Sequence, residues 1–77
     1  MIAWTDYPIT ELGDIPGQIA PIRQVIVLSY DGDKYCQITV FGVESPVDVK
    51  VGYLYTRRAR AGEGHHLTRA ALKGLEK

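Results

Sequence analysis

Apolar and polar residues alternate over the middle of the chain, which is the pattern of strands that bury one face. The segment IRQVIVLSY at 22–30 is rich in β-branched residues and is followed by DGDK, a strong hairpin signal. The segment YCQITVF at 35–41 is the expected return strand, and VDVKVGYLYT at 47–56 alternates cleanly as a third strand. Short connections between these strands predict an antiparallel meander over residues 22–56.

The register of the strands follows from matching apolar positions across each turn, because a shift of one residue moves every side chain of a strand to the opposite face. The pairs expected across the first turn are Tyr30 with Tyr35, Val27 with Ile38 and Val25 with Val40. The pairs expected across the second turn are Gly42 with Val47, Val40 with Val49 and Ile38 with Val51.

In this register, both faces of the sheet carry apolar side chains. The first face consists of Val25, Val27, Cys36, Ile38, Val40, Val47, Val49, Val51, Tyr53 and Tyr55. The second face is mixed, and its apolar members are Ile26, Leu28, Tyr30, Tyr35, Phe41 and Leu54. Such a sheet needs two covers, and a face left uncovered would be an interaction surface, because large exposed apolar patches commonly mark such sites.

The N-terminal segment 1–21 is interrupted by Pro8 and Pro21, and it predicts an irregular loop that wraps the sheet. Pro16-Gly17 within it suits the centre of a type II turn, because proline presets φ and glycine accepts a positive φ. Residues 1–4 are a candidate for an additional strand. The apolar residues that this segment offers as a cover are Ile2, Trp4, Tyr7, Ile9, Leu12, Ile15 and Ile19.

The C-terminal segment LTRAALKGLEK predicts a short helix with Thr68 as its N-cap. Its apolar side would be formed by Leu67, Ala71, Leu72 and Leu75. A helix this short, with Gly74 inside it, does not hold by itself in water, where about 12–15 residues are needed. It must therefore dock on the sheet, and the alternative is a disordered tail.

We predict a single small domain over residues 1–77, of the α+β or mainly β class, with a small open β-barrel as the alternative topology. Its parts are the wrapping segment 1–21, the antiparallel sheet 22–56 and the basic tail 57–77. A lone hydrophobic core is only marginally stable in a chain of 77 residues. Association with a partner, or with a second copy in a homodimer, would add to that stability.

Charge is distributed unevenly along a chain whose net charge is zero. Residues 1–56 carry three basic and seven acidic side chains, for a net charge of −4. Residues 57–77 carry six basic and two acidic side chains, for a net charge of +4. This asymmetry indicates an acidic partner for the tail, nucleic acid included, or a tail that folds back on its own acidic body.

The surplus of apolar surface and the shortage of catalytic groups favour a non-catalytic interaction module. Such a module would bind another protein, or a second copy of itself, through a sheet face or a free strand edge. The residues expected at this interface are Ile26, Leu28, Tyr30, Tyr35, Phe41 and Leu54.

The alternative function is nucleic-acid binding by the basic tail, because arginines pair well with phosphate oxygens. The residues expected to contact nucleic acid or an acidic protein are Arg57, Arg58, Arg60, Arg69 and Lys73. An isoelectric point of about 6.7 speaks against a dedicated nucleic-acid binder. The plainer interpretation of these charges is a solvated loop that keeps a small apolar protein in solution.

An enzyme is the third hypothesis, and only Cys36, His65 and His66 hint at it. We expect Cys36 on the inward face of the sheet, where a buried thiol is usually an inert small hydrophobe. A structural zinc site needs four ligands, and the adjacent histidines supply two. Asp31 and Asp33 are explained by turn chemistry. We therefore predict no catalytic site, no metal and no cofactor, and no small-molecule substrate is indicated.

The expected location is cytoplasmic. The single cysteine of the chain fits a reducing compartment. No apolar run approaches the ~20 residues needed to span a bilayer, so no membrane association is expected. The opening MIAWTDYPIT lacks the charged and apolar regions of a secretory signal.

Overall fold

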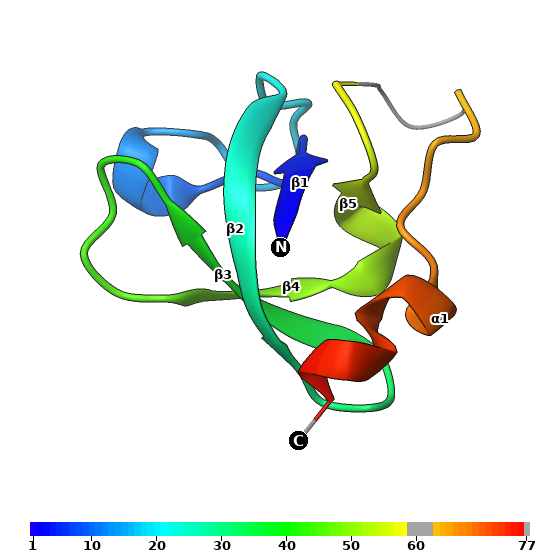
Figure 1. Cartoon of the computed structure of the whole chain (residues 1–77). Coiled ribbons are helices and arrows are strands. Elements are labelled where there is room, and N and C mark those ends of the chain that lie inside the picture. Colours follow the sequence, from blue (N-terminus) through cyan, green and yellow to red (C-terminus); the bar gives the residue numbers. More distant parts are fainter. Residues whose placement is uncertain (59–62, 77) are drawn as a thin grey trace.

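The computed structural model describes residues 1–58 and 63–76, which form a mainly β domain with a short C-terminal helix. The strands are β1 (Ile2–Thr5), β2 (Arg23–Tyr30), β3 (Tyr35–Val40), β4 (Val47–Lys50) and β5 (Leu54–Tyr55). The helices are α1 (Arg69–Leu72) and the 3-10 turns η1 (Thr10–Leu12), η2 (Val51–Tyr53) and η3 (Lys73–Leu75). All strand pairs are antiparallel, in the order β4-β3-β2-β1-β5 (Figure 1). The predicted meander and the additional N-terminal strand are confirmed.

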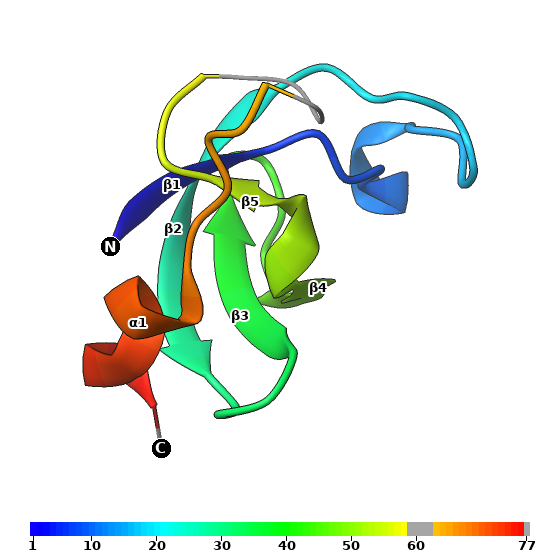
Figure 2. The same ribbon diagram turned by 90° about the vertical axis from the view of Figure 1, so that its right-hand side faces the viewer.

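The sheet curls into a half-barrel because a short connection joins its two outer strands. β4 and β5 stand at opposite ends of the strand order, yet only the three residues of η2 separate them in the chain. In a flat sheet the outermost of five strands would lie about 19 Å apart, at roughly 4.8 Å for each neighbouring pair. The connection spans at most about 14 Å when fully extended. The two edges must therefore bend toward each other, as Figure 2 shows for β4 and β5.

An irregularity at Leu28 decides which residues of β2 face the core. Before it, the pairs are those predicted from the sequence, Val25 with Val40 and Val27 with Ile38. After it the register shifts by one residue, so Tyr30 lies opposite Cys36, and the predicted pair with Tyr35 is wrong. The extra residue of a β-bulge changes which face the following side chains occupy. Tyr30 is therefore buried.

The pairing of β3 with β4 is displaced by four residues from the predicted one. Its pairs are Ile38 with Val47, Gln37 with Asp48, Cys36 with Val49 and Tyr35 with Lys50. Because the displacement is even, the valines keep the predicted face although their partners are wrong. The connection lengthens to residues 41–46, and Gly42 there has a φ of 90°, a conformation that glycine adopts readily.

The segment 47–56 was expected as one strand, and this prediction is wrong. η2 interrupts it, and β5 crosses to the far edge of the sheet, where it pairs with β1. Leu54 and Tyr55 are consecutive and would face opposite sides, yet both are buried. Leu54 pairs with Thr5, whereas the ring of Tyr55 lies 5.0 Å from that of His66, between centroids.

The hydrophobic core fills the inside of the curl, and both ends of the chain complete it. Its buried members are Ala3, Ile9, Val25, Val27, Tyr30, Cys36, Ile38, Val40, Val49, Leu54, Leu67 and Leu72. The N-terminal loop contributes Ile9, whereas Ile15 and Ile19 of the same loop are exposed, contrary to their expected role as a cover. The predicted turn at Pro16-Gly17 is confirmed, because Gly17 has a φ of 84° and Gln18 N–H donates to the Ile15 carbonyl at 3.1 Å.

The predicted C-terminal helix forms and docks on the sheet. The hydroxyl of Thr68 accepts a hydrogen bond from Ala71 N–H at 3.2 Å, as expected of the N-cap. Leu72 is buried and Leu75 packs against the core, whereas Ala71 is exposed rather than on the apolar side. A bridge between Tyr30 and Glu76 ties the end of this segment to β2.

Candidate functional site

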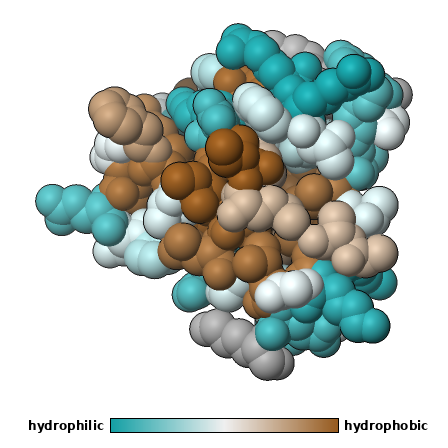
Figure 3. All heavy atoms as spheres, viewed as in Figure 1, coloured by the Kyte–Doolittle hydropathy of each residue, from teal (hydrophilic) through white to brown (hydrophobic). Residues whose placement is uncertain are grey.

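A group of large apolar side chains lies exposed on the outer face of β1 and β2, and we call it the outer apolar patch. It consists of Ile2 (57% exposed), Ile26 (49%) and Leu28 (46%). Ile2 and Ile26 are cross-strand partners, so their side chains leave the sheet next to each other. Figure 3 shows hydrophobic atoms gathered over β1 and β2 on this side of the molecule.

The structure divides the residues that the sequence placed on one interface. Ile26, Leu28 and Tyr35 are exposed on the sheet, and Phe41, 98% exposed, lies in the turn after β3. The remaining members, Tyr30 and Leu54, are in the core, so their assignment to an exposed face is wrong. The bulge at Leu28 turns Tyr30 inward, and the interruption by η2 does the same for Leu54.

Sequence reasoning missed Ile2, which extends the patch across β1. The sequence contains a pattern that could have indicated this face, because the large side chains of Ile2 and Trp4 alternate with the smaller Ala3 and Thr5, which the structure buries. Only the pairing of β1 with β2 shows that Ile2 and Ile26 belong to the same surface.

The strand edges offer less backbone than the meander predicted. Residues 65–67 cover the outer edge of β5, where Thr56 N–H donates to the His65 carbonyl at 2.7 Å and Leu67 N–H to the Leu54 carbonyl at 2.9 Å. The other outer strand, β4, is four residues long. A partner strand would thus find one short free edge in the described part of the chain.

A groove of about 710 Å³ lies between the N-terminal loop and the β4–η2 segment, and we call it the tyrosine groove. Tyr7 and Tyr53 line it, with ring centroids 5.0 Å apart and ring planes at 63°, an edge-to-face arrangement that aromatic pairs favour. Tyr53 is 42% exposed and Tyr7 is half-buried. The acidic residues of its lining are Asp6, Glu11 and Asp48.

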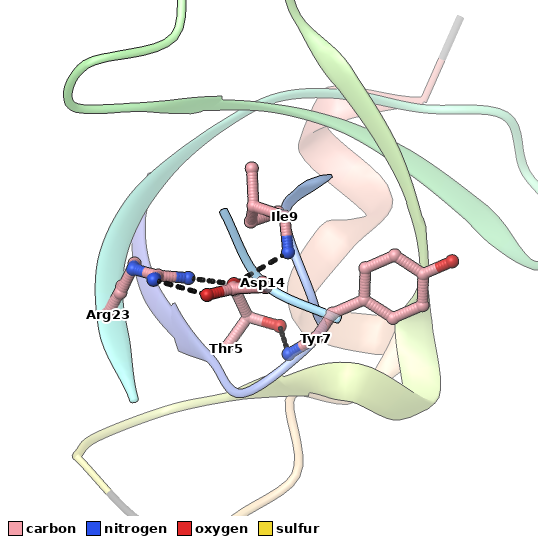
Figure 4. A network of polar contacts seen from close by, with 5 residues as sticks. All are labelled: Thr5, Tyr7, Ile9, Asp14 and Arg23. Carbon is pink, nitrogen blue, oxygen red and sulfur yellow. Dashed lines mark hydrogen bonds and ion pairs between the residues drawn. The ribbon is translucent and has the colours of Figure 1, made fainter. Parts of the chain in front are cut away.

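Thr5 holds the two tyrosines in place. Its hydroxyl donates to the Tyr53 carbonyl at 2.6 Å and accepts from Tyr7 N–H at 3.1 Å. Thr5 is buried, so neither bond is exchanged for water. One side chain of β1 therefore fixes both walls of the groove, as Figure 4 shows for the side of Tyr7.

The loop that carries Tyr7 is tied to β2 by Asp14 and Arg23. The Arg23 guanidinium forms a two-pronged contact with the Asp14 carboxylate, whose second hydrogen bond is 2.8 Å long, and Ile9 N–H donates to the same carboxylate at 2.7 Å (Figure 4). The guanidinium, followed by the Ile9 amide, lowers the pKa of Asp14 to about 2. The contact in turn raises the pKa of Arg23.

Asp6, at the groove, also contacts the buried Tyr55. The Tyr55 hydroxyl donates to the Asp6 carboxylate at 3.2 Å. Burial, followed by the nearby Asp6 charge, raises the pKa of Tyr55 to about 12. Tyr55 therefore stays a neutral donor at physiological pH, and it anchors the position of Asp6.

The basic residues predicted to contact nucleic acid are not brought together in one cluster. Arg57 and Arg58 follow β5 at one end of the molecule, whereas α1, which begins at Arg69, lies at the other end (Figures 1 and 2). These three and Lys73 are exposed, and Arg60 lies outside the described residues. The guanidinium of Arg57 donates to Nε2 of His65 at 2.6 Å. In the described part of the chain, no ion pair joins these bases to the acidic body.

The residues considered for chemistry have separate structural roles. Cys36 is buried, and burial raises the pKa of its thiol to about 11, which keeps it in the unreactive neutral form. His65 contacts Arg57, whereas the ring of His66 packs on Tyr55. Asp31 accepts hydrogen bonds from the amides of residues 33, 34 and 35, at 2.8, 3.0 and 3.1 Å, so the turn chemistry expected of it is confirmed.

Of the helices within residues 1–58 and 63–76, none is long and apolar enough to cross a membrane. Comparison of the chain with models of protein families, with curated proteins and with solved structures finds no match.

Proposed function

We propose that this chain is a non-catalytic module that binds another protein through the outer apolar patch. The observation that carries the proposal is the exposure of three large apolar side chains, Ile2, Ile26 and Leu28, on one face of β1 and β2. Isolated exposed apolar residues are ordinary on protein surfaces, whereas a contiguous group on a rigid sheet is typical of a contact surface.

The sheet face has more support than a strand edge as the contact. β5 is covered by residues 65–67, and β4 offers an edge of four residues. A short edge forms few main-chain hydrogen bonds with a partner strand. A partner bound to the outer apolar patch, in contrast, would remove the surface of several large side chains from water. Such burial stabilises a complex by about 25 cal/mol per Å² of apolar area.

The proposal includes a role without catalysis and a cytoplasmic location. Cys36, the nucleophile considered from the sequence, is buried as a neutral thiol. The thiol is free rather than in a disulfide, which is consistent with a reducing compartment.

The test replaces the apolar side chains in the middle of the patch with charged ones. We expect the double variant Ile26→Lys/Leu28→Lys to fold, because both positions are half-exposed, and to lose its protein partner. The partner is to be isolated from nuclease-treated lysate on the wild-type protein, purified, and titrated against both proteins by calorimetry. Ile15→Lys is the matched control, because it adds one charge at an exposed isoleucine of the N-terminal loop, outside the patch.

A direct complex with the wild-type protein and with Ile15→Lys, weakened at least about tenfold in the double variant, would support the proposal. Equal affinity for all three proteins would refute the outer apolar patch as the contact. A wild-type protein that retains partners only in lysate without nuclease would refute the proposal as a whole.

The alternative is nucleic-acid binding by the basic tail. Exposure of Arg57, Arg58 and Arg69 is its support, and their distribution over two ends of the molecule speaks against it. Titration of single-stranded and duplex oligonucleotides at low and moderate salt tests it, because each phosphate contact steepens the salt dependence of binding. Replacing Arg57, Arg58 and Arg60 with alanine should abolish retention of nucleic acid if this alternative is correct, and should leave protein binding nearly intact if the main proposal is correct.

A further inference from the structure

We infer that the tyrosine groove is a second binding site, which takes an extended segment of a partner protein through a lysine or arginine side chain of that segment. The juxtaposition that carries the inference is a pair of tyrosine rings, Tyr7 and Tyr53, in a groove whose charged lining residues are all acidic. The site is distinct from the outer apolar patch and does not depend on it.

The tyrosine pair supplies an aromatic surface for a cation. The rings stand at 63° to each other with centroids 5.0 Å apart, so they form two walls of different orientation. A cation attracted to the face of an aromatic ring lies within about 6 Å of the ring centroid. Because Tyr53 is partly exposed, an incoming side chain can reach this surface.

The charge of the groove selects the kind of ligand. Asp6, Glu11 and Asp48 line it, and none of the lining residues that the structure describes is basic. A cationic group would therefore be held by the ring faces and by carboxylates together. The same three charges would repel the phosphates of a nucleic acid, so the groove and the basic tail favour opposite partners.

The edge of β4 explains why the ligand is an extended segment of protein. Val51 N–H donates to the Lys34 carbonyl at 2.9 Å, and hydrogen-bonding direction alternates along an antiparallel strand. The backbone of Asp48 consequently points away from β3, toward the side on which β4 has no strand partner among the described residues. Asp48 itself lines the groove, so an extended backbone can hydrogen-bond there.

The size of the groove agrees with such a ligand. A volume of about 710 Å³ is within the range of roughly 300–1,000 Å³ that is usual for binding sites in proteins. The walls are also held by buried or paired groups, because Thr5 ties Tyr7 to Tyr53 and Asp14 ties the loop to Arg23. A site whose walls are already in place loses less conformational entropy on binding.

The experiment measures the affinity of the full chain for short fluorescein-labelled peptides by fluorescence anisotropy. The probes are peptide mixtures with randomised flanks and one fixed central residue, which is arginine, lysine, glutamine or glutamate. We expect the arginine and lysine mixtures to bind at least about tenfold more tightly than the glutamine mixture, and the glutamate mixture to bind least. Chemical shifts of backbone amides, measured with the best mixture, should change around Tyr53 and Asp48.

Two sets of variants separate this site from a general attraction of charges. Tyr53→Ala removes one ring and Glu11→Gln/Asp48→Asn removes two charges, and each should reduce the preference for arginine over glutamine by about tenfold. Their matched controls lie outside the groove lining, Tyr35→Ala for the ring and Asp31→Asn/Asp33→Asn for the charges, and these should retain the preference. Urea unfolding of every variant shows that the proteins compared are folded.

Equal affinity for all four mixtures, tightest binding of the glutamate mixture, or the same loss in the control variants would overturn the inference. Displacement of the peptides by arginine amide alone at equal concentration would also overturn it, because the site would then take a small cation rather than a protein segment. Tighter binding of a single-stranded RNA probe in the groove would do the same. The variant Ile26→Lys/Leu28→Lys should bind the peptides normally, so failure of the outer apolar patch and failure of this site are distinguishable.

Discussion

The hydroxyl of Thr5 donates a hydrogen bond of 2.6 Å to the main-chain carbonyl of Tyr53, and it accepts one of 3.1 Å from Tyr7 N–H. Thr5 lies on the first strand and Tyr53 in the 3-10 turn that carries the chain from one edge of the sheet to the other. The bond thus joins β1 to the turn that connects the two edge strands, β4 and β5, at the point where the tyrosine groove forms. Three segments of the chain meet at one buried oxygen.

Replacing Thr5 with valine keeps the shape of the side chain and removes that oxygen. Two partly buried main-chain groups, the Tyr53 carbonyl and the Tyr7 N–H, then lose their partner, so we expect the free energy of unfolding to fall by about 1–3 kcal/mol. Urea denaturation followed by the fluorescence of Trp4 measures the change. The matched control is Thr10→Val, at an exposed threonine, for which a change under about 0.5 kcal/mol is expected. Equal losses in the two variants would contradict the anchoring role of Thr5.

The core should be most sensitive at Ile38, on the central part of the sheet. Its side chain is fully buried, so Ile38→Ala should lower the free energy of unfolding by about 2–5 kcal/mol through lost burial and a residual cavity. Phe41 lies three residues after Ile38 and has a larger side chain, but that side chain is exposed, so Phe41→Ala leaves no cavity in the core. It should change stability by less than about 0.5 kcal/mol. A larger loss at Phe41 than at Ile38, in the same urea titration, would show that the register of β3 is wrong.

Stability should depend on pH through Asp14. The pKa of this carboxyl group is about 2 in the folded chain, against an ordinary value of 3.8, so the unfolded chain binds more protons between these values. The stabilisation is therefore fully present above about pH 4 and is lost as the pH falls toward 2. The measurement is the urea midpoint between pH 2 and pH 6.

The variant Asp14→Asn isolates this contribution. Between pH 2 and pH 4 the free energy of unfolding of this variant should change less steeply with pH than that of the wild-type protein. The difference in slope corresponds to at most about one proton taken up on unfolding. Asp31, whose pKa is also lowered, mainly by the amide of Asp33, contributes equally to both proteins and cancels in the difference. Parallel pH profiles of the wild-type protein and the variant would mean that Asp14 and Arg23 do not form this contact in solution.

Cys36 should resist alkylation in the folded chain. With its pKa at about 11, the thiolate fraction at pH 8 is only about a thousandth, and the side chain is buried as well. We expect iodoacetamide to react at least about 100-fold more slowly in buffer than in denaturing urea. Ser45→Cys in a Cys36→Ala background, with the thiol in an exposed turn, should react at nearly the same rate in both conditions. Fast native alkylation of Cys36 would place it outside the core.

The amino-acid sequence by itself determined those features that depend on neighbouring positions. The alternation around Val27 and Ile38 determined the core face of the first hairpin, because side chains of a strand alternate whatever the rest of the fold does. The N-cap at Thr68 and the turn at Pro16-Gly17 were likewise readable, since each follows from the conformation of a few consecutive residues.

Only the tertiary structure decided the features that depend on contacts between distant segments. The alternation of 47–56 is the same whether a strand continues or stops, so the interruption at η2 and the burial of Leu54 were invisible in it. The bulge that buries Tyr30 and the pairing that sets Ile2 beside Ile26 likewise arise from strand partners rather than from local sequence. The tyrosine groove follows from the same closure, because the curl of the sheet brings η2 against the loop after β1. The residue pattern specifies which apolar side chains would be stabilised by burial, whereas the closure of the sheet decides which of them are buried.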